Sequence, residues 1–137
     1  MQAIEIDSGA IVAAAGLIPE EGPVIMLNLL RYRERADYGD RTDFAPCSGR
    51  EAYHQRYAPA IGPTVVAEGI RLFWIGTALA SVVGPSDERW DEILLVEYPS
   101  FAAFRRLVES PKYEAEAAMH RKAALADWRL IATIKAS

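Results

Sequence analysis

Cysteine, histidine and clustered basic charge are scarce in this sequence of 137 residues, and each shortage excludes a class of function. Cys47 is the one cysteine, which excludes an internal disulfide, a thiolate metal cluster and a redox pair of cysteines. We therefore expect a reducing, cytoplasmic location. The net charge is −4, and the 15 Lys and Arg residues are scattered along the chain. Nucleic acid and acidic membrane surfaces are therefore not expected as partners.

Long hydrophobic runs are also missing. The apolar stretch 9–18 has acidic residues on both sides, no basic segment before it, and too few residues to cross a bilayer. It predicts a helix that is capped by Asp7 or Ser8 and stopped by Pro19. We therefore predict a helical lead-in over residues 1–22, followed by a single domain over residues 23–137. No phosphate-binding glycine loop or nucleophile elbow occurs, and we expect no cofactor.

The rest of the chain alternates between predicted strands and helices. Ser48 and Glu51 form a capping-box pattern, so a helix is predicted from about residue 49, kinked or divided by Pro59 and Pro63. Ser100 predicts a second helix, and Ser110-Pro111 restarts it. Residues 81–84 are expected to continue the edge of the second strand, and residues 33–47 form a long loop. The predicted strands are 23–30, 70–77, 90–98 and 128–134.

This order predicts an α+β fold of the ferredoxin-like, split βαβ type with an antiparallel sheet. Helices on only one side leave the other face of such a sheet bare. The strands have too little polar alternation for that face to meet water. We therefore predict a homodimer in which two sheets stack face to face, because an isolated chain would expose a large apolar patch.

Three segments near the C-terminus resemble a known family. They are the strand-to-helix junction 97–100 (Glu-Tyr-Pro-Ser), the helix start 110–113 (Ser-Pro-Lys-Tyr), and His120-Arg121 ahead of Asp127. The sequence from about residue 20 onward resembles the bacterial DUF1330 family (domain of unknown function) of the dimeric α+β barrel superfamily. The resemblance implies a ferredoxin-like protomer that pairs through its sheets and holds ligands between sheet and helices. It implies no single reaction.

The helix after Ser110 carries the residues best suited to chemistry. Helical spacing places Tyr113, Ala117, His120 and Arg121 on one face, with a gap at the alanine. A ring, an imidazole and a fixed cation suit a small anionic or carbonyl-bearing ligand. His120 is the candidate catalytic acid or base. The candidate ligand-binding residues are Asn28, Tyr53, Tyr57, Arg71, Trp74, Tyr98, Tyr113 and Arg121.

Structural interpretations stand beside these functional ones. Buried tyrosine and tryptophan rings are ordinary at helix–sheet and dimer interfaces, which favours a packing role for Tyr53, Tyr57 and Trp74. His120 is equally well explained by a structural hydrogen bond. Arg121 is also suited to pair with a carboxylate, with Glu97, Asp91 and Asp127 as the choices. A structural role is likewise favoured over general-base work for Glu97.

A metal site is not expected, because His54 and His120 are the only histidines and each has one carboxylate at helical spacing. Three functions remain open. The first is a cofactor-independent enzyme, a monooxygenase or an isomerase, acting on a small carbonyl or phenolic compound. The second is a non-catalytic metabolite-binding protein that uses the same cleft. The third is a structural homodimer whose interior is filled by side chains.

Overall fold

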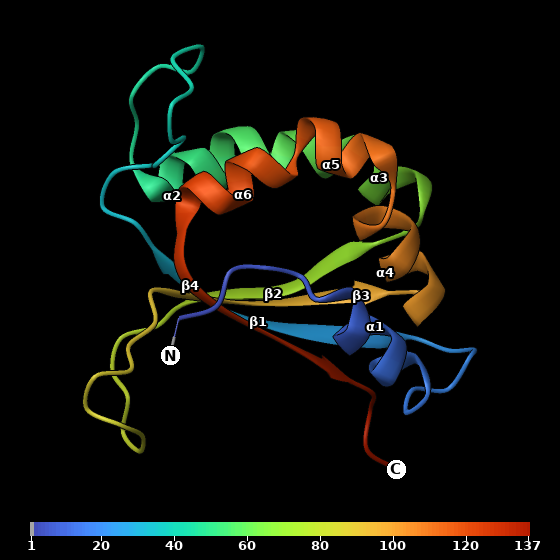
Figure 1. Cartoon of the computed structure of the whole chain (residues 1–137). Helices are drawn as coiled ribbons and strands as arrows, with labels where there is room; N and C mark the ends of the chain where they lie inside the picture. Colours follow the sequence, from blue (N-terminus) through green and yellow to red (C-terminus); the bar gives the residue numbers. More distant parts are fainter. Residues whose placement is uncertain (1) are drawn as a thin grey trace.

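A four-stranded antiparallel sheet with strand order β2-β3-β1-β4 forms the centre of the computed structural model, which describes residues 2–137 (Figure 1). The fold confirms the predicted α+β architecture with a split βαβ arrangement. The strands are β1 (Val24–Tyr32), β2 (Arg71–Thr77), β3 (Glu92–Tyr98) and β4 (Leu125–Thr133). The helices are α1 (Ser8–Ala15), α2 (Gly49–Glu51), η1 (Ala52–Tyr57), α3 (Ala58–Ala67), α4 (Phe101–Val108), α5 (Pro111–Glu116) and α6 (Ala118–Ala124).

Short polar side chains begin the helices at the places where the sequence predicted them. Ser48 accepts a hydrogen bond from the Glu51 amide, and the Glu51 carboxylate accepts one from the Ser48 amide, which completes the capping box. Ser100 caps α4 and Ser110 caps α5 in the same way. At the N-terminus, Asp7 caps α1. These bonds satisfy amides that have no partner inside a helix.

The helix after Ser48 continues through both prolines, but its winding changes. Residues Ala52–Tyr57 form a π-helix, in which the amide of Ala58 donates to the carbonyl of Tyr53. Pro59 has no N–H to donate to the preceding turn, and Pro63 lies inside α3. The predicted division at the prolines is therefore a change of helix type rather than a break. The wide turn brings Tyr53, His54 and Tyr57 to the side of the helix that faces the sheet.

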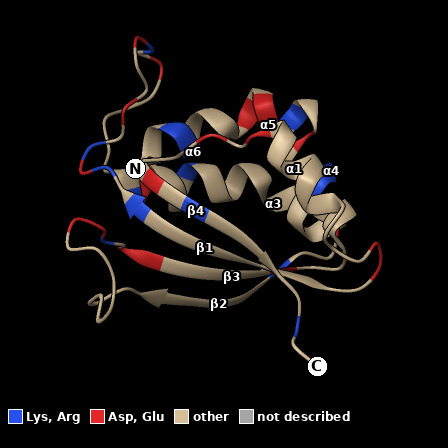
Figure 2. Ribbon diagram, turned by 60° about the horizontal axis from the view of Figure 1, so that its bottom comes forward, with Lys and Arg blue, Asp and Glu red and all other residues tan. Residues whose placement is uncertain are grey.

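The helices cover one face of the sheet (Figure 1). Alternate residues of β1, among them Val24, Met26 and Leu30, are buried against that helical layer. Their neighbours Ile25, Leu27 and Leu29 point to the opposite face, where they are only half-buried. No helix lies under that face in Figure 1, and in Figure 2 the strands carry charge mainly near their ends. The apolar outer face that the sequence predicted is therefore present.

Two long connections project from the sheet at the same end of the molecule (Figure 1). One comprises residues 33–48 and packs against α6. The other, residues 78–91, is irregular, so the prediction that residues 81–84 extend the edge strand is wrong. Its Val82 and Val83 side chains are more than 90% exposed, and none of the strands in the described residues pairs with them. Within residues 2–137, no helix is long and apolar enough to cross a membrane.

Candidate functional site

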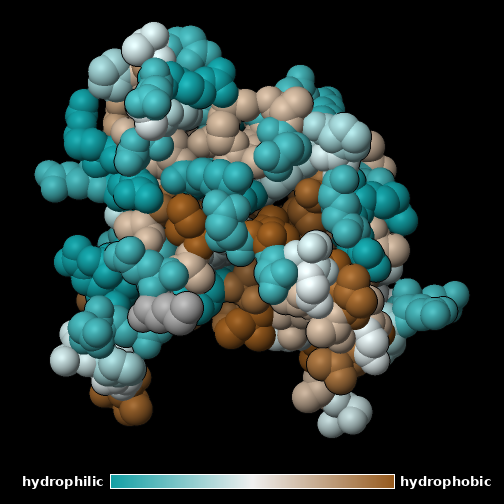
Figure 3. Space-filling view, in the orientation of Figure 1, coloured by the Kyte–Doolittle hydropathy of each residue, from teal (hydrophilic) through white to brown (hydrophobic). Residues whose placement is uncertain are grey.

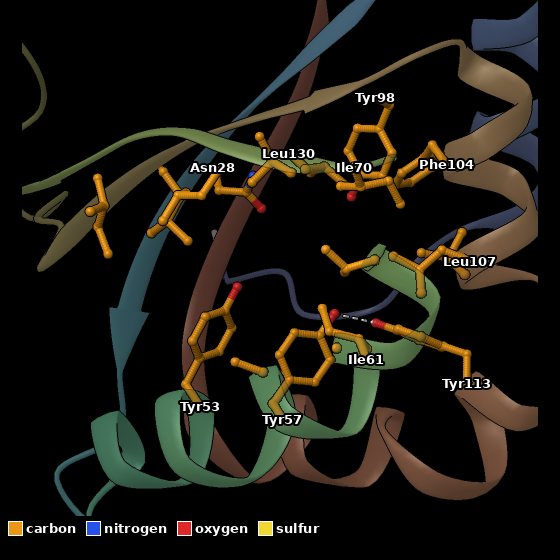
Figure 4. A pocket seen from close by; sticks show the side chains of 18 of the residues that line it. Asn28, Tyr53, Tyr57, Ile61, Ile70, Tyr98, Phe104, Leu107, Tyr113 and Leu130 are labelled. Carbon is orange, nitrogen blue, oxygen red and sulfur yellow. Dashed lines mark hydrogen bonds between the residues drawn. The ribbon is translucent and has the colours of Figure 1, made fainter. Parts of the chain in front are cut away.

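A cavity of about 260 Å³ lies between the inner face of the sheet and the helices η1, α3, α4 and α5 (Figure 4). We call it the central cavity. Its wall is mostly aliphatic, with Ile61 and Val65 from α3 and Leu107 from α4. On β2, Leu72 and Ile75 line it while staying about half exposed, so the cavity opens along this edge strand. Its volume is slightly below the usual range of ligand sites, roughly 300–1,000 Å³.

Three tyrosine hydroxyls face this apolar space. Tyr53 and Tyr57 project from η1 and Tyr98 projects from β3 (Figure 4). Burial, reinforced by the neighbouring Tyr113, raises the pKa of all three above the ordinary value of a phenol. They therefore stay protonated and act as hydrogen-bond donors. Within residues 2–137, the hydroxyls of Tyr53 and Tyr98 form no hydrogen bond, and although these residues are only 8% and 7% exposed, their oxygen atoms stay accessible from the cavity.

These hydroxyls need an acceptor inside the cavity, either solvent or a ligand, because a donor that is buried without an acceptor costs about 1–3 kcal/mol. A ligand that offers oxygen atoms would serve as that acceptor. The central cavity thus combines an apolar wall with donors that the fold leaves available. That combination is typical of sites for small molecules that carry a carbonyl or an acidic group.

A buried arginine supports one of these hydroxyls. The Nη1 group of Arg121 donates a hydrogen bond to the hydroxyl of Tyr113, which lies 2.8 Å from the hydroxyl of Tyr57. Because the cation polarises the Tyr113 O–H group, Tyr113 is the better donor of the pair. Tyr57 then accepts, and its own hydrogen is free to point into the cavity. The hydrogen bonds from Arg121 through Tyr113 to Tyr57 thus extend the electrostatic effect of the cation to the cavity wall.

The environment of Arg121 is itself uncommon. Its side chain is only 3% exposed, and its guanidinium lies 5.2 Å from the centre of the Trp128 ring and 5.6 Å from that of Tyr113. Across the described chain, no carboxylate approaches it within 4.0 Å. Its Nε group also has no hydrogen-bond partner among residues 2–137. The predicted pairing with Glu97, Asp91 or Asp127 is therefore wrong, and aromatic rings hold the cation instead.

Asn28 is the polar group that β1 contributes. Its Oδ1 accepts a hydrogen bond of 3.1 Å from the indole of Trp128, and its Nδ2 donates one of 3.3 Å to the carbonyl of Met26. An amide nitrogen carries two hydrogens, so one remains for the cavity that Asn28 lines. These two bonds explain how a side-chain amide is accommodated in a buried strand.

The structure brings together five of the eight residues that the sequence proposed for ligand binding, and places the other three and the catalytic candidate His120 elsewhere. Asn28, Tyr53, Tyr57, Tyr98 and Tyr113 line the central cavity. Arg121 lies behind Tyr113 and does not line it. His120, Arg71 and Trp74 are outside it altogether. Whether any of them binds a ligand stays a prediction.

His120 faces the loop 33–48 instead of the cavity, because the helix is interrupted at Ala117. There the backbone departs from helical angles (φ −119°), and α5 ends before α6 begins. The expectation that His120 shares one face with Tyr113 is therefore wrong, whereas Arg121 does lie beside Tyr113. His120 Nδ1 lies 2.7 Å from the hydroxyl of Tyr38, and its ring packs edge-on against Phe44. Burial, and then the charges of Arg56 and Arg41, lower the pKa of His120.

A β-bulge on β2 explains the position of Trp74, whereas Arg71 precedes the bulge and pairs in regular register with Glu97. Leu72 pairs with Val96 and Trp74 with Leu95, so one residue of β2 is unpaired between them. The bulge lets both Leu72 and Ile75 face the cavity and turns Trp74 to the outer face, where its ring covers Gly76. Arg71 is exposed and forms an ion pair of 2.7 Å with Glu97, which lowers the pKa of that carboxyl group. The structural interpretation of Glu97 is thus the one that the geometry supports.

Sequence reasoning missed His54 as a cavity residue, together with two partners. His54 lines the central cavity, and its Nε2 lies 2.6 Å from Glu92 and 3.1 Å from the hydroxyl of Tyr32. Two signals were present. Glu92 is the acidic residue at the start of an apolar strand, and His54 is three residues before Tyr57. Neither signal shows that the two meet, because they come from distant parts of the chain.

Metal-binding groups do not converge in the part of the chain that the structure describes. No three side chains of His, Cys, Asp or Glu gather there in a way that would hold an ion. The polar groups of the cavity are hydroxyls, an amide and one imidazole, a set that favours hydrogen bonding to an organic ligand over metal coordination.

The fold and the cavity define an α+β protein of the ferredoxin-like type with a small, apolar internal site. A family model described as "Domain of unknown function (DUF1330)" matches residues 47–134. The chain belongs to this DUF1330 family, as the resemblance in the sequence predicted. The matched range begins just before α2 and leaves out β1.

Two solved structures are similar over nearly the whole chain. One is the methylated RPA0582 protein, with 35% identity and a TM-score of 0.85, covering 99% of this chain and 96% of that one. The other is RPA0582, a protein of unknown function from Rhodopseudomonas palustris, with 36% identity and a TM-score of 0.85, covering 100% of this chain and 99% of that one. No curated protein matches significantly. These likenesses show the family and the fold without naming a ligand.

Proposed function

We propose that this protein binds a small, largely apolar molecule, of about the size of one substituted ring, that carries a carbonyl or carboxylate oxygen. The observation that carries the proposal is the set of protonated tyrosine hydroxyls that face the central cavity, two of which form no hydrogen bond within residues 2–137. The aliphatic wall would hold the ring, while Tyr53, Tyr57 and Tyr98 would donate to the oxygen.

The charge around the site supports an oxygen that is negative or becomes so. Arg121 contributes a positive charge through Tyr113 and Tyr57, and no carboxylate within residues 2–137 neutralises it at close range. Buried charges act strongly because the protein interior screens them less than water does. A cationic ligand is disfavoured for the same reason.

Three ring compounds of similar size test this proposal: benzoate, acetophenone and ethylbenzene. They share the ring and differ in the oxygen atoms they offer. We expect benzoate and acetophenone to bind, with ethylbenzene about tenfold weaker or worse, because it leaves the hydroxyls unpaired. Isothermal titration calorimetry and thermal shifts measure this directly.

Two tyrosine variants separate the cavity from the rest of the molecule. Tyr57→Phe should remove most of the preference for the oxygen-bearing probes. Tyr38→Phe, outside the cavity, should keep it. Failure of all three compounds to bind, or an equal loss of preference in both variants, would overturn the proposal.

A second role, self-association, is favoured by the outer face of the sheet. It carries large apolar side chains on adjacent strands, with Leu27 on β1 facing Leu95 on β3 and Ile131 on β4. Ile131 and Trp74 are about half exposed in the single chain. We propose that a second copy of this chain covers this face, since an uncovered apolar surface of this kind is unfavourable in water.

The dimer is tested by measuring mass in solution with light scattering after size-exclusion chromatography. Leu95→Lys places a charge in the middle of the outer face and should shift a dimeric wild type to monomers. Val66→Lys is the matched control, because Val66 is an exposed aliphatic residue on α3. A monomeric wild type, or dissociation by both variants, would contradict this role.

A further inference from the structure

Four side chains from four segments meet at one end of the central cavity. His54 of η1 and Arg50 of α2 approach Glu92, the first residue of β3, with distances of 2.6 and 2.7 Å. Tyr32 of β1 donates its hydroxyl hydrogen to the same Glu92 oxygen that His54 contacts. Glu92 is only 5% exposed, while the His54 side chain remains about one-third exposed and lines the cavity.

The hydrogen bonds determine which ring nitrogen of His54 carries the proton. Glu92 is ionised and can only accept, and the hydrogen of Tyr32 is already directed to Glu92. Nε2 therefore has to be the protonated nitrogen, with its N–H donating to the carboxylate. In the neutral ring, the lone pair is then on Nδ1. Within residues 2–137, no group forms a hydrogen bond with Nδ1.

Glu92 is kept charged although it is buried. Burial by itself would raise the pKa of this carboxyl group, but hydrogen bonds from Tyr32, Arg50 and His54 outweigh that effect and hold the pKa below its usual value. A charged carboxylate behind an imidazole stabilises the ring when it takes up a second proton. This is how an orienting carboxylate supports a histidine that acts as a base.

We propose that His54 is the proton-transfer group of the central cavity, with Glu92 as its positioning residue, and that the protein isomerises an enolisable carbonyl compound. The inference rests on the proposed function, because the same cavity and the same oxygen-binding hydroxyls hold the substrate. It favours isomerisation over oxygenation, since proton transfer needs no further reactant.

The step is balanced in atoms and electrons. Nδ1 of His54 takes a proton from the carbon next to the carbonyl, so that a C–H bond breaks and an N–H bond forms. The electron pair of the C–H bond becomes a carbon–carbon double bond, and the carbonyl π pair moves to the oxygen. Tyr57, backed by Tyr113 and Arg121, would stabilise this enolate oxygen. Return of the proton to the same carbon gives exchange, and its delivery to another position gives an isomer.

Two features separate this assignment from a purely structural role for the cluster. His54 is on the π-helical turn that also carries Tyr53 and Tyr57, so base and oxygen donors share one segment, and π-helical turns are frequent at functional sites. A cluster that served only to attach η1 to β3 would not need a histidine that reaches the cavity and has an unbonded nitrogen.

Phenylpyruvate is a suitable probe, because it carries a ring, a carbonyl group and a carboxylate. In D₂O, nuclear magnetic resonance follows the exchange of the two hydrogens next to its carbonyl group above the rate in buffer. We expect the wild-type protein to accelerate this exchange. His54→Gln should lower the enzymatic rate by about 100-fold or more, which is typical for loss of a general base. Gln55→Ala, an exposed neighbour on the same helix, should have the wild-type rate.

Glu92→Gln keeps a hydrogen-bond acceptor for Nε2 and removes the charge, which makes it the test of positioning. The exchange rate should fall, and the acidic limb of its pH profile should move to lower pH, because the protonated ring loses its carboxylate. The charged and titratable groups that face the ring are Glu92, Tyr32, Tyr53 and Arg50. A variant in which the cluster was only loosened would have a lower exchange rate, but the acidic limb of its pH profile would not move.

The outcomes are distinguishable from those of the proposed function. No acceleration by the wild-type protein, or exchange that survives in His54→Gln, overturns the inference even where benzoate and acetophenone bind through Tyr57. Failure of those probes to bind overturns the proposed function itself. Thermal unfolding of each variant shows whether it is folded. If His54→Gln is unfolded, Glu92→Gln decides: an unmoved acidic limb overturns the inference and a shifted one supports it.

Discussion

The hydroxyl groups of Tyr57 and Tyr113 lie 2.8 Å apart, although 56 residues separate them in the chain. Their rings meet edge to face with centres 6.1 Å apart, so the contact joins η1 to α5 both by packing and by a hydrogen bond. Behind it lies the buried guanidinium of Arg121. One polar corner of the central cavity is therefore built by two helices and supported by a cation that the ligand would not touch.

Removing the charge of Arg121 should affect an anionic ligand more than a neutral one. We expect Arg121→Met to weaken the binding of benzoate about tenfold, or about 1.4 kcal/mol, and to leave acetophenone within about threefold. Calorimetry with both probes measures the difference. Arg105→Met is the control, because Arg105 is partly exposed and pairs with Glu109 four residues later. Equal losses for the two probes would contradict the role of the charge.

The bond between Asn28 and Trp128 should stabilise the fold, and a double-mutant cycle measures its contribution. Asn28→Leu leaves the buried indole N–H of Trp128 without its acceptor, which should lower the free energy of unfolding by about 1–3 kcal/mol. In the Asn28→Leu, Trp128→Phe double variant this unpaired donor is absent, so the two losses should not add. Urea unfolding of the four proteins provides the comparison. Strict additivity of the two losses in the free energy of unfolding would show that the hydrogen bond between Asn28 and Trp128 does not stabilise the fold.

Acidification should loosen the attachment of the loop 33–48 to α6. Burial, and then Arg56 and Arg41, hold the pKa of His120 below its ordinary value of 6.5. As the pH falls below that value, the unfolded chain takes up a proton that the folded protein resists, so stability is complete at higher pH and declines on acidification. Hydrogen exchange of loop amides between pH 8 and pH 5 tests this, and His120→Gln should remove most of the dependence. Protection of the loop amides that does not change with pH in the wild-type protein would contradict this prediction.

Gly49 should not tolerate a side chain. A Cβ atom at this position would lie 2.3 Å from the carbonyl oxygen of Arg33 and 2.5 Å from that of Ala124. Gly49→Ala therefore has to displace backbone, and we expect a loss of about 3 kcal/mol or more in the free energy of unfolding. Gly16→Ala meets only an ordinary contact of 3.5 Å and is the control. Thermal or urea unfolding compares the two, and similar stabilities would contradict the close approach.

Local features of the fold were predictable because their causes are local. The serines at positions 48, 100 and 110 begin helices by accepting hydrogen bonds from amides three residues later. Alternation of burial along β1 follows from the geometry of an extended chain. The predicted boundaries differ from the observed ones by a few residues, as in β4, which begins at Leu125 rather than at Trp128.

Predictions failed where one irregular residue changes the direction of those that follow. The break at Ala117 shifts the phase of the helix and separates His120 from Tyr113. The bulge on β2 turns Trp74 to the outer face and Ile75 to the cavity. Periodicity assumes a regular element, so it predicts neither event. A similar irregularity, the π-helical turn, places His54 beside the cavity.

The sequence by itself determined the α+β class, the order and capping of the helices and the apolar outer face, because these depend on neighbours in the chain, and it also proposed all four tyrosines that line the cavity. Only the tertiary structure decided which charged and titratable groups meet. Arg121 lies against Tyr113 and Trp128 rather than a carboxylate, and His54 meets Glu92 across 38 residues. Such contacts depend on how helices and strands pack on one another, which residue spacing along a chain does not record.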